Sequence, residues 1–119
     1  MDKVSIVTHQ GKAVIICDFR ACKPADYAPI VAEATKVITA NPPKSARVVS
    51  LFEEARFDPS IVLLMEAFVR KVTPHMAANG LVGITGLRKV AFLGIRPLYR
   101  CPAELFDTVE AAKDWLAAR

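Results

Sequence analysis

The feature that most constrains the fold of this chain is the regular alternation of strand-like and helix-like segments between turn residues. Residues 4–9 alternate with the two-residue period of a half-buried strand. Residues 13–19 are almost continuously apolar, which is typical of a strand inside a sheet. Gly11 between them tolerates positive φ, so the pair predicts a hairpin. Three further strands are expected at residues 46–52, 79–85 and 104–106.

Four segments carry apolar residues at helical spacing. They run from near Asp26 to Ala40, from Ser60 to about Val72, from Gly86 to about Leu98, and onward from Thr108. Pro29 falls in the first turn of the first helix, where a missing N–H is tolerated. Asp58-Pro59 pairs an N-cap residue with a proline at the first helical position, which is typical of a helix start.

The resulting order, β-β-α-β-α-β-α-β-α, predicts an α/β fold with a mixed, mainly parallel five-stranded sheet and helices packed against it. The length of 119 residues fits one domain over residues 1–119. A content of 53% hydrophobic and 24% charged residues excludes a disordered chain. No uncharged apolar run reaches the roughly 18 residues of a membrane-spanning helix, so no membrane span is expected.

The N-terminus and the cysteines indicate a cytoplasmic location. Met1-Asp2-Lys3 leads directly into strand-like sequence, without the apolar core of a signal peptide. Three cysteines are too few for a disulfide scaffold, which favours a reducing compartment. Four residues separate Cys17 from Cys22, instead of the two found in a zinc knuckle or redox pair. We therefore expect neither a metal nor a cofactor.

The sequence carries no recognisable catalytic motif. It has neither the Gly-x-Ser-x-Gly turn of a hydrolase nor the His-Glu-x-x-His pair of a zinc protease. His9 and His75 have no serine or cysteine nucleophile at a suggestive spacing, and a surface or capping role is expected for both. These observations predict a protein that is not an enzyme.

The positive charge of the chain is concentrated in one stretch. The formal net charge is +4, and no acidic residue lies between Glu66 and Glu104. The basic residues within this stretch are Arg70, Lys71, Arg88, Lys89, Arg96 and Arg100. They form either ordinary solvated helix faces or a patch for an anionic small molecule, an acidic lipid or a phosphorylated partner. No nucleic-acid-binding motif accompanies them, so no nucleic-acid partner is expected.

A candidate anion site lies where the fourth predicted strand meets the third helix. The strand ends at Thr85, Gly86 lets the backbone turn, and the helix begins with free N–H groups. Arg88 and Lys89 lie in its first turn, where cations oppose the helix dipole. A bound anion would relieve this conflict, whereas plain solvent exposure is the alternative explanation.

Fold topology supports a cleft in the same region. Ligands of open parallel sheets collect at the carboxyl ends of the strands. The segments expected there are residues 18–20, 52–54, 85–89 and 107–108. All of them carry polar or charged side chains, although loops are polar in most proteins.

The second and third predicted helices carry more apolar residues than one buried face can hold. With Val90 facing inward, the surplus residues are Val62, Leu63, Val69, Phe92 and Leu93. Leaving a large apolar side chain in water forgoes about 1.5–3 kcal/mol. Three explanations stay open: the side chains pack against each other, they form a homodimer surface through these two helices, or they line a lipid-like pocket.

Two segments resemble a known family. Val82-Gly-Ile-Thr-Gly-Leu-Arg-Lys-Val90 and Leu105-Phe-Asp-Thr-Val-Glu-Ala-Ala-Lys-Asp-Trp-Leu116 are similar to segments of the SpoIIAA-like branch of the STAS superfamily. The resemblance extends from Val4 to Leu116, and the fold is shared with CRAL-TRIO-type lipid-transfer proteins. It implies a pocket for a lipid or another small molecule between the sheet and the helices.

The resemblance also implies a phosphorylation candidate. In anti-sigma-factor antagonists of this superfamily, a kinase phosphorylates a serine that opens the second helix. Arg56-Phe-Asp-Pro-Ser60-Ile is the corresponding segment, so Ser60 is the candidate. Where the antagonists have Asp-Ser-Ser-Gly, this chain has Asp-Pro-Ser-Ile.

The sequence therefore predicts a non-enzymatic cytoplasmic module that binds a small amphipathic or anionic, lipid-like ligand. The apolar part of the ligand is expected against Phe68, Phe92 and Leu93. Its headgroup is expected near Thr85, Gly86, Arg88 and Lys89. The alternative is a STAS-type protein-interaction domain with a signalling partner, switched by phosphorylation at Ser60.

Overall fold

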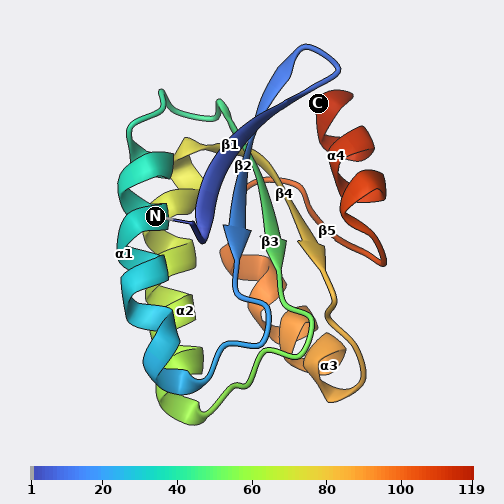
Figure 1. The fold of residues 1–119 in the computed structure, drawn as a ribbon. Helices are drawn as coiled ribbons and strands as arrows, with labels where there is room; N and C mark the ends of the chain where they lie inside the picture. Colours follow the sequence, from blue (N-terminus) through green and yellow to red (C-terminus); the bar gives the residue numbers. More distant parts are fainter. Residues whose placement is uncertain (1) are drawn as a thin grey trace.

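The computed structural model describes residues 2–119, apart from the side chains of Leu87, Arg88, Ala91, Ile95 and Leu98. Within this range a five-stranded sheet has the order β1-β2-β3-β4-β5 (Figure 1). β1 is antiparallel to β2, and the other neighbouring strands are parallel. The strands are β1 (Val4–His9), β2 (Lys12–Asp18), β3 (Ala46–Leu51), β4 (Met76–Val82) and β5 (Ala103–Phe106). The predicted fold class is confirmed.

Four α-helices alternate with the parallel strands in the predicted order. They are α1 (Tyr27–Thr39), α2 (Pro59–Val72), α3 (Leu87–Ile95) and α4 (Val109–Ala117). Short 3₁₀ helices lie at Pro24–Asp26, Thr73–His75 and Arg96–Leu98. None of the helices in the described part of the chain has both the length and the apolar character needed to cross a bilayer.

The fourth strand has different limits from those predicted. It begins at Met76 instead of Asn79 and ends at Val82 instead of Thr85. The reason for the early end is Gly83, whose φ of +85° takes the backbone out of the extended conformation. Thr85 therefore lies in a loop and not in the strand.

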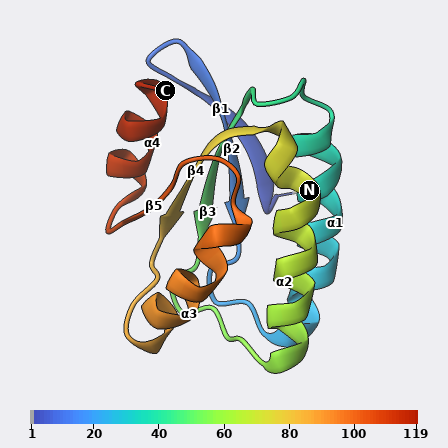
Figure 2. The ribbon, with the colours of Figure 1, turned by 180° about the vertical axis from the view of Figure 1, so that it is seen from behind.

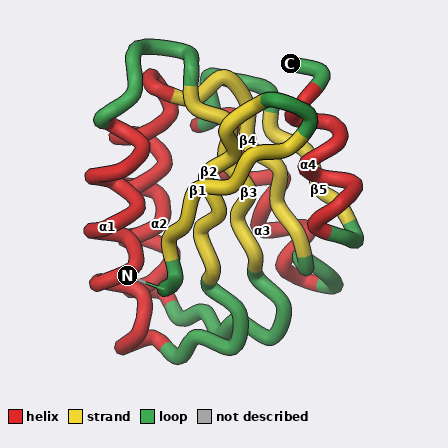
Figure 3. The backbone as a smooth tube through the Cα atoms, turned by 45° about the horizontal axis from the view of Figure 1, so that its top comes forward, coloured by secondary structure: helices red, strands yellow, loops and turns green. Residues whose placement is uncertain are grey.

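The helices form layers on both faces of the sheet. Figure 3 shows α1 and α2 side by side on one side of the strands and α4 on the other. In the view from behind, α3 lies on the same side as α2 (Figure 2). A larger core fills the space under α1 and α2 and includes Phe92 of α3. A smaller core joins Ala112 and Leu116 of α4 to Val14, Val49 and Val82 of the sheet.

Local sequence signals account for the element boundaries. Gln10 and Gly11 have φ of 51° and 77°, the backbone of a type I′ turn, which matches the twist of two antiparallel strands. The predicted hairpin is confirmed. At the start of α2, Asp58 Oδ1 accepts a 2.9 Å hydrogen bond from the Ile61 N–H, and Pro59 follows the cap as predicted.

The apolar faces of α2 and α3 differ from the prediction. Phe92, expected to be surplus, is only 5% exposed, whereas Val90, expected to face inward, is 66% exposed. Phe92 packs against the Tyr99 ring at 6.4 Å between centroids. Because residues two apart are separated by roughly 200° around a helix, burying Phe92 turns Val90 outward. In α2, Val69, also expected to be surplus, is buried as well.

Candidate functional site

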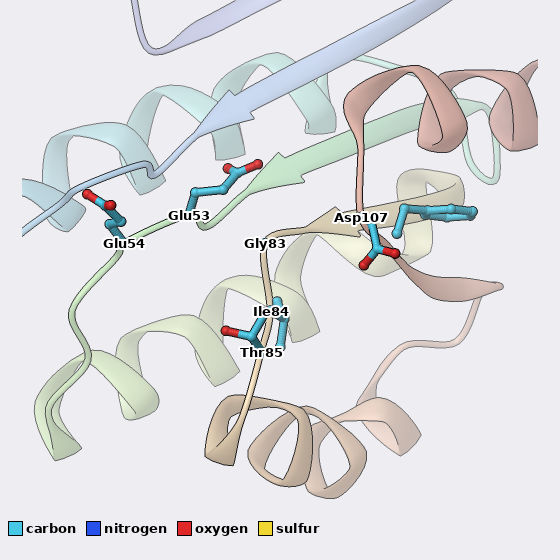
Figure 4. Close-up of a pocket in the computed structure, with 7 residues that line it drawn as sticks. Glu53, Glu54, Gly83, Ile84, Thr85 and Asp107 are labelled. Carbon is cyan, nitrogen blue, oxygen red and sulfur yellow. The ribbon is translucent and has the colours of Figure 1, made fainter.

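A cleft opens where β3, β4 and β5 end (Figure 4). Its volume is about 720 Å³. We call it the carboxyl-end cleft, and its lining residues are Glu53, Glu54, Gly83, Ile84, Thr85, Phe106 and Asp107. Three of the four segments that topology places at this edge contribute to the lining; residues 18–20 after β2 do not.

Backbone hydrogen bonds continue past the strand ends and fix the loops around the cleft. The Phe52 N–H donates to Val82 O at 2.8 Å, and the Ala21 N–H donates to Glu53 O at 2.9 Å. Gly83 lies so close to the loop after β3 that a Cβ atom built on it would be 2.6 Å from Glu53 N. Glu54 also has a positive φ, of 59°. One wall of the cleft is therefore a tight contact between two loops, which requires glycine at position 83.

The polar part of the cleft is acidic. Glu53, Glu54 and Asp107 contribute three carboxyl groups, and the residues described as lining it include no lysine or arginine. Glu53 Oε2 is buried and has no hydrogen-bond partner among the residues that the structure describes. Carboxylates are hydrogen-bond acceptors only, so this surface suits a group that donates N–H or O–H bonds.

The three carboxyl groups do not converge on one point. In Figure 4, the side chains of Glu53 and Glu54 point away from each other, and Asp107 comes from the far side of Gly83. Across residues 2–119, no three histidine, cysteine or acidic side chains with described positions are arranged to hold a metal ion. The arrangement can bind a donor or a positive charge through separate contacts.

The remaining lining is apolar. Ile84 is half-buried and packs against the larger core. Phe106, the last residue of β5, packs against the smaller core, with its ring 5.4 Å from that of Trp115. The cleft therefore combines two apolar side chains that pack against the cores with three carboxyl groups.

The residues expected to hold the headgroup differ from one another in their surroundings. Thr85 lines the carboxyl-end cleft. Gly86 follows it as the N-cap of α3, with φ of 59°. Lys89 is exposed, and its backbone N–H bonds to Gly86 O at 3.0 Å. The side chain of Arg88 lies outside the described residues.

The residues expected to hold the apolar part of a ligand are not among those lining the cleft. Phe68 and Phe92 are buried in the larger core. Leu93 is exposed on α3, and Leu63 is 67% exposed on α2. Sequence reasoning identified the segments that hold Glu53, Glu54 and Asp107 but not the apolar lining by Ile84 and Phe106.

Two of the basic residues near the sheet are paired with carboxylates. Arg96 Nη2 donates to Glu104 Oε1 at 2.7 Å, so the acidic residue that ends the basic stretch pairs with a cation inside it. Arg20 makes a two-pronged contact with Asp18, with both N···O distances 2.9 Å. These hydrogen bonds lower the pKa of the Asp18 carboxyl. Neither arginine lines the cleft.

Ser60 is exposed at the second position of α2. Its hydroxyl donates to Asp58 Oδ1 at 2.6 Å. Hydrogen bonds from Ser60 and from the Ile61 N–H lower the pKa of the Asp58 carboxyl. Ser60 is therefore accessible, and its hydroxyl belongs to the cap of the helix.

The surroundings of the cysteines and histidines indicate structural roles. Burial raises the pKa of Cys17 to about 12 and also raises the pKa values of Cys22 and Cys101. Thiols with raised pKa values are poor nucleophiles at neutral pH. His75 Nδ1 lies 2.7 Å from Asn41 O, just beyond the end of α1. His9 Nε2 lies 2.7 Å from Asp114 Oδ1, linking β1 to α4.

Comparisons of the chain with protein-family models, curated proteins and solved structures found no match. The resemblance to the SpoIIAA-like branch of the STAS superfamily stays a prediction from the two quoted segments. The functional argument consequently depends on the geometry of the cleft.

Proposed function

We propose that this chain is a non-enzymatic binding module that takes a small amphipathic ligand in the carboxyl-end cleft. The observation that carries the proposal is the cleft itself, at the edge of a parallel sheet where ligands collect. Its volume of about 720 Å³ falls within the range of roughly 300–1,000 Å³ typical of ligand sites. All three cysteines are free, which supports placing the module in the reducing cytoplasm.

The lining supports a ligand with an apolar part and a hydrogen-bond-donating polar group. Ile84 and Phe106 offer the apolar contact. Glu53, Glu54 and Asp107 offer acceptors and negative charge. An anionic headgroup at this place would meet like charges, whereas an amine or a hydroxyl group would be attracted. We therefore favour a donor or cationic headgroup over the anionic one suggested by Arg88 and Lys89.

Three probes that differ only in the headgroup test this assignment. Octylamine, octanol and octanoate are titrated separately into isotope-labelled protein, and the amide signals of Gly83, Thr85 and Asp107 are followed by NMR. We expect octylamine to shift these signals at the lowest concentration and octanoate at the highest. Tighter binding of octanoate, or no shift at these amides with any probe, would contradict the proposal.

Charge-removing variants locate the interaction. Asp107→Asn and Glu53→Gln should each weaken octylamine binding several-fold, because each removes one attractive charge from the cleft lining. Glu33→Gln, on α1 and not among the lining residues, is the matched control and should leave binding unchanged. Equal effects of all three variants would mean that octylamine responds to net charge and not to the cleft.

The alternative function, a signalling domain switched at Ser60, has one supporting observation. Ser60 is exposed near the N-terminus of α2, where the helix dipole favours a phosphate. However, the Asp58 carboxylate lies 2.6 Å from its hydroxyl, and a phosphate there would face a like charge. The geometry therefore supports this alternative less than ligand binding in the cleft.

A further inference from the structure

The strand β1 forms one edge of the sheet, and its hydrogen-bonding pattern can be followed residue by residue. The hairpin places His9 opposite Lys12, and the Asp18 N–H donates to Lys3 O at 2.8 Å. Hydrogen-bonded and non-hydrogen-bonded pairs alternate along an antiparallel ladder. The odd-numbered residues of β1 therefore bond to β2. Val4, Ile6 and Thr8 direct their N–H and C=O groups toward the open edge.

The two edges of the sheet differ in their protection against pairing with another chain. β5 has only four residues, and its Glu104 is held by Arg96. β1 has six residues, Val-Ser-Ile-Val-Thr-His, with no proline and no Asp, Glu, Lys or Arg. Its register with β2 is unbroken by a bulge. Short length, charges, prolines and bulges are the features that normally protect an edge.

The centre of this edge is also apolar. Ile6 is 62% exposed, although its neighbour across the hairpin, Ile15, is buried. In Figure 1, β1 crosses the front of the sheet from the side of α1 to the side of α4, and no other segment lies in front of it. The edge thus presents backbone donors and acceptors together with an uncovered isoleucine.

We propose that β1 pairs antiparallel with β1 of a second copy of this chain, about a two-fold axis at Ile6. The outward N–H and C=O groups of Val4, Ile6 and Thr8 make the hydrogen bonds, and an axis at Ile6 sets Ile6 opposite Ile6 and Val4 opposite Thr8 of the second copy. Each isoleucine then covers the other. The same register sets Lys3 opposite His9 and Asp2 opposite Gln10, so no like formal charges face each other. This self-complementarity favours a second copy over an unrelated strand.

This inference does not rest on the proposed function. The cleft lies at the ends of β3, β4 and β5 and contains no residue of β1. If β1 does not pair, octylamine binding can still be measured in the monomer. If the cleft binds no ligand, the dimer can still form.

Sedimentation or light-scattering mass, measured over a concentration series of the full chain, tests the pairing. We expect the natural chain to approach the mass of a dimer at high concentration. Ile6→Lys should weaken the dimer at least about tenfold, because it removes apolar burial and sets two like charges opposite each other. Leu63→Lys, on the exposed face of α2, is the matched control and should leave the dimer unchanged. Thermal unfolding confirms that both variants are folded.

Cross-linking tests the register. Oxidation of Ile6→Cys should join two chains, because the two-fold axis places these residues opposite each other. Thr8→Cys is exposed on the same strand but lies four residues from its equivalent in the paired ladder, so it should not cross-link.

Three outcomes would overturn the proposal. The first is a natural chain that stays monomeric at every concentration, which would leave the edge to a strand of another protein. The second is a dimer that survives Ile6→Lys. The third is a dimer that Leu63→Lys dissolves, which would assign the interface to α2 and α3.

Discussion

At the scale of single residues, Gly83 decides how the cleft is built. It combines a φ of +85° with backbone contact to Glu53, so a side chain is excluded by conformation and by space. Gly86 has a comparable φ of +59°, but no atom of the described residues lies within 4 Å of a Cβ added there. The two glycines separate the effect of positive φ from that of steric clash. Both have a positive φ, but only Gly83 lies against Glu53.

Gly83→Ala should therefore destabilise the protein more than Gly86→Ala. A non-glycine residue in such a backbone conformation costs about 1–3 kcal/mol, and Gly83→Ala adds a clash that the loop after β3 must relieve. Chemical denaturation measures the difference in free energy of unfolding. Gly83→Ala should also weaken octylamine binding. Equal stability of the two variants would mean that the contact with Glu53 yields without cost.

Single residues also show where sequence reasoning about the site reached its limit. The positions of Glu53 and Asp107 after their strands could be predicted, since topology alone places strand ends together. The sign of the charge in the cleft could not be, because spacing does not tell which way a side chain points. Arg88 and Lys89 suggested an anion site, yet the described lining contains carboxyl groups instead.

At the scale of elements, α2 depends on its cap. Asp58 accepts hydrogen bonds from the Ile61 N–H and from the Ser60 hydroxyl. Asp58→Ala should lower the melting temperature by several degrees, because it removes the acceptor of both bonds. Ser60→Ala should lower it less, since the bond to Ile61 remains. Thermal unfolding followed by circular dichroism measures both. A larger effect of Ser60→Ala would contradict the proposed role of Asp58.

The cap also has a defined dependence on pH. The pKa of Asp58 is lowered from its ordinary value of 3.8 in the folded chain. Its stabilisation is therefore present above this value and lost as the pH falls through the lower, folded-state pKa. Asn caps a helix comparably without titrating. Asp58→Asn should therefore lose less stability than the natural chain between neutral pH and about pH 3.

The spacing of apolar residues does not predict which side of α3 faces the core. Val90 and Phe92 are both apolar, so either can be assigned to the inner face from the pattern alone. The structure buries Phe92 in the larger core, with the Tyr99 ring as an aromatic neighbour. That partner lies beyond the end of α3 at Ile95, so the helical spacing of apolar residues does not extend to it.

At the scale of the whole molecule, different numbers of helices cover the two cores. One face of the sheet is covered by α1 and α2 with Phe92, and the other by α4. Leu116→Ala should destabilise the protein by about 2–5 kcal/mol, because it leaves a cavity in a core with little material to fill it. Leu63→Ala, at an exposed position, should change stability by less than about 0.5 kcal/mol. Equal values in chemical denaturation would contradict the dependence on α4.

The element order and the single antiparallel strand could be predicted from the sequence, because two-residue and helical periods are separated by clear turn residues such as Gly11 and Pro59. The layer to which each helix belongs required the structure. All four helices have an apolar face, and nothing in their spacing assigns α4 to the opposite side from α1 and α2.

The smaller core joins the beginning of the chain to a late segment, since Val14 of β2 packs with Leu116 of α4. During synthesis, the strands and the first helices leave the ribosome well before α4. The face of β2 that carries Val14 therefore stays exposed until α4 has been synthesised. The smaller core therefore closes only when the last helix docks on the sheet.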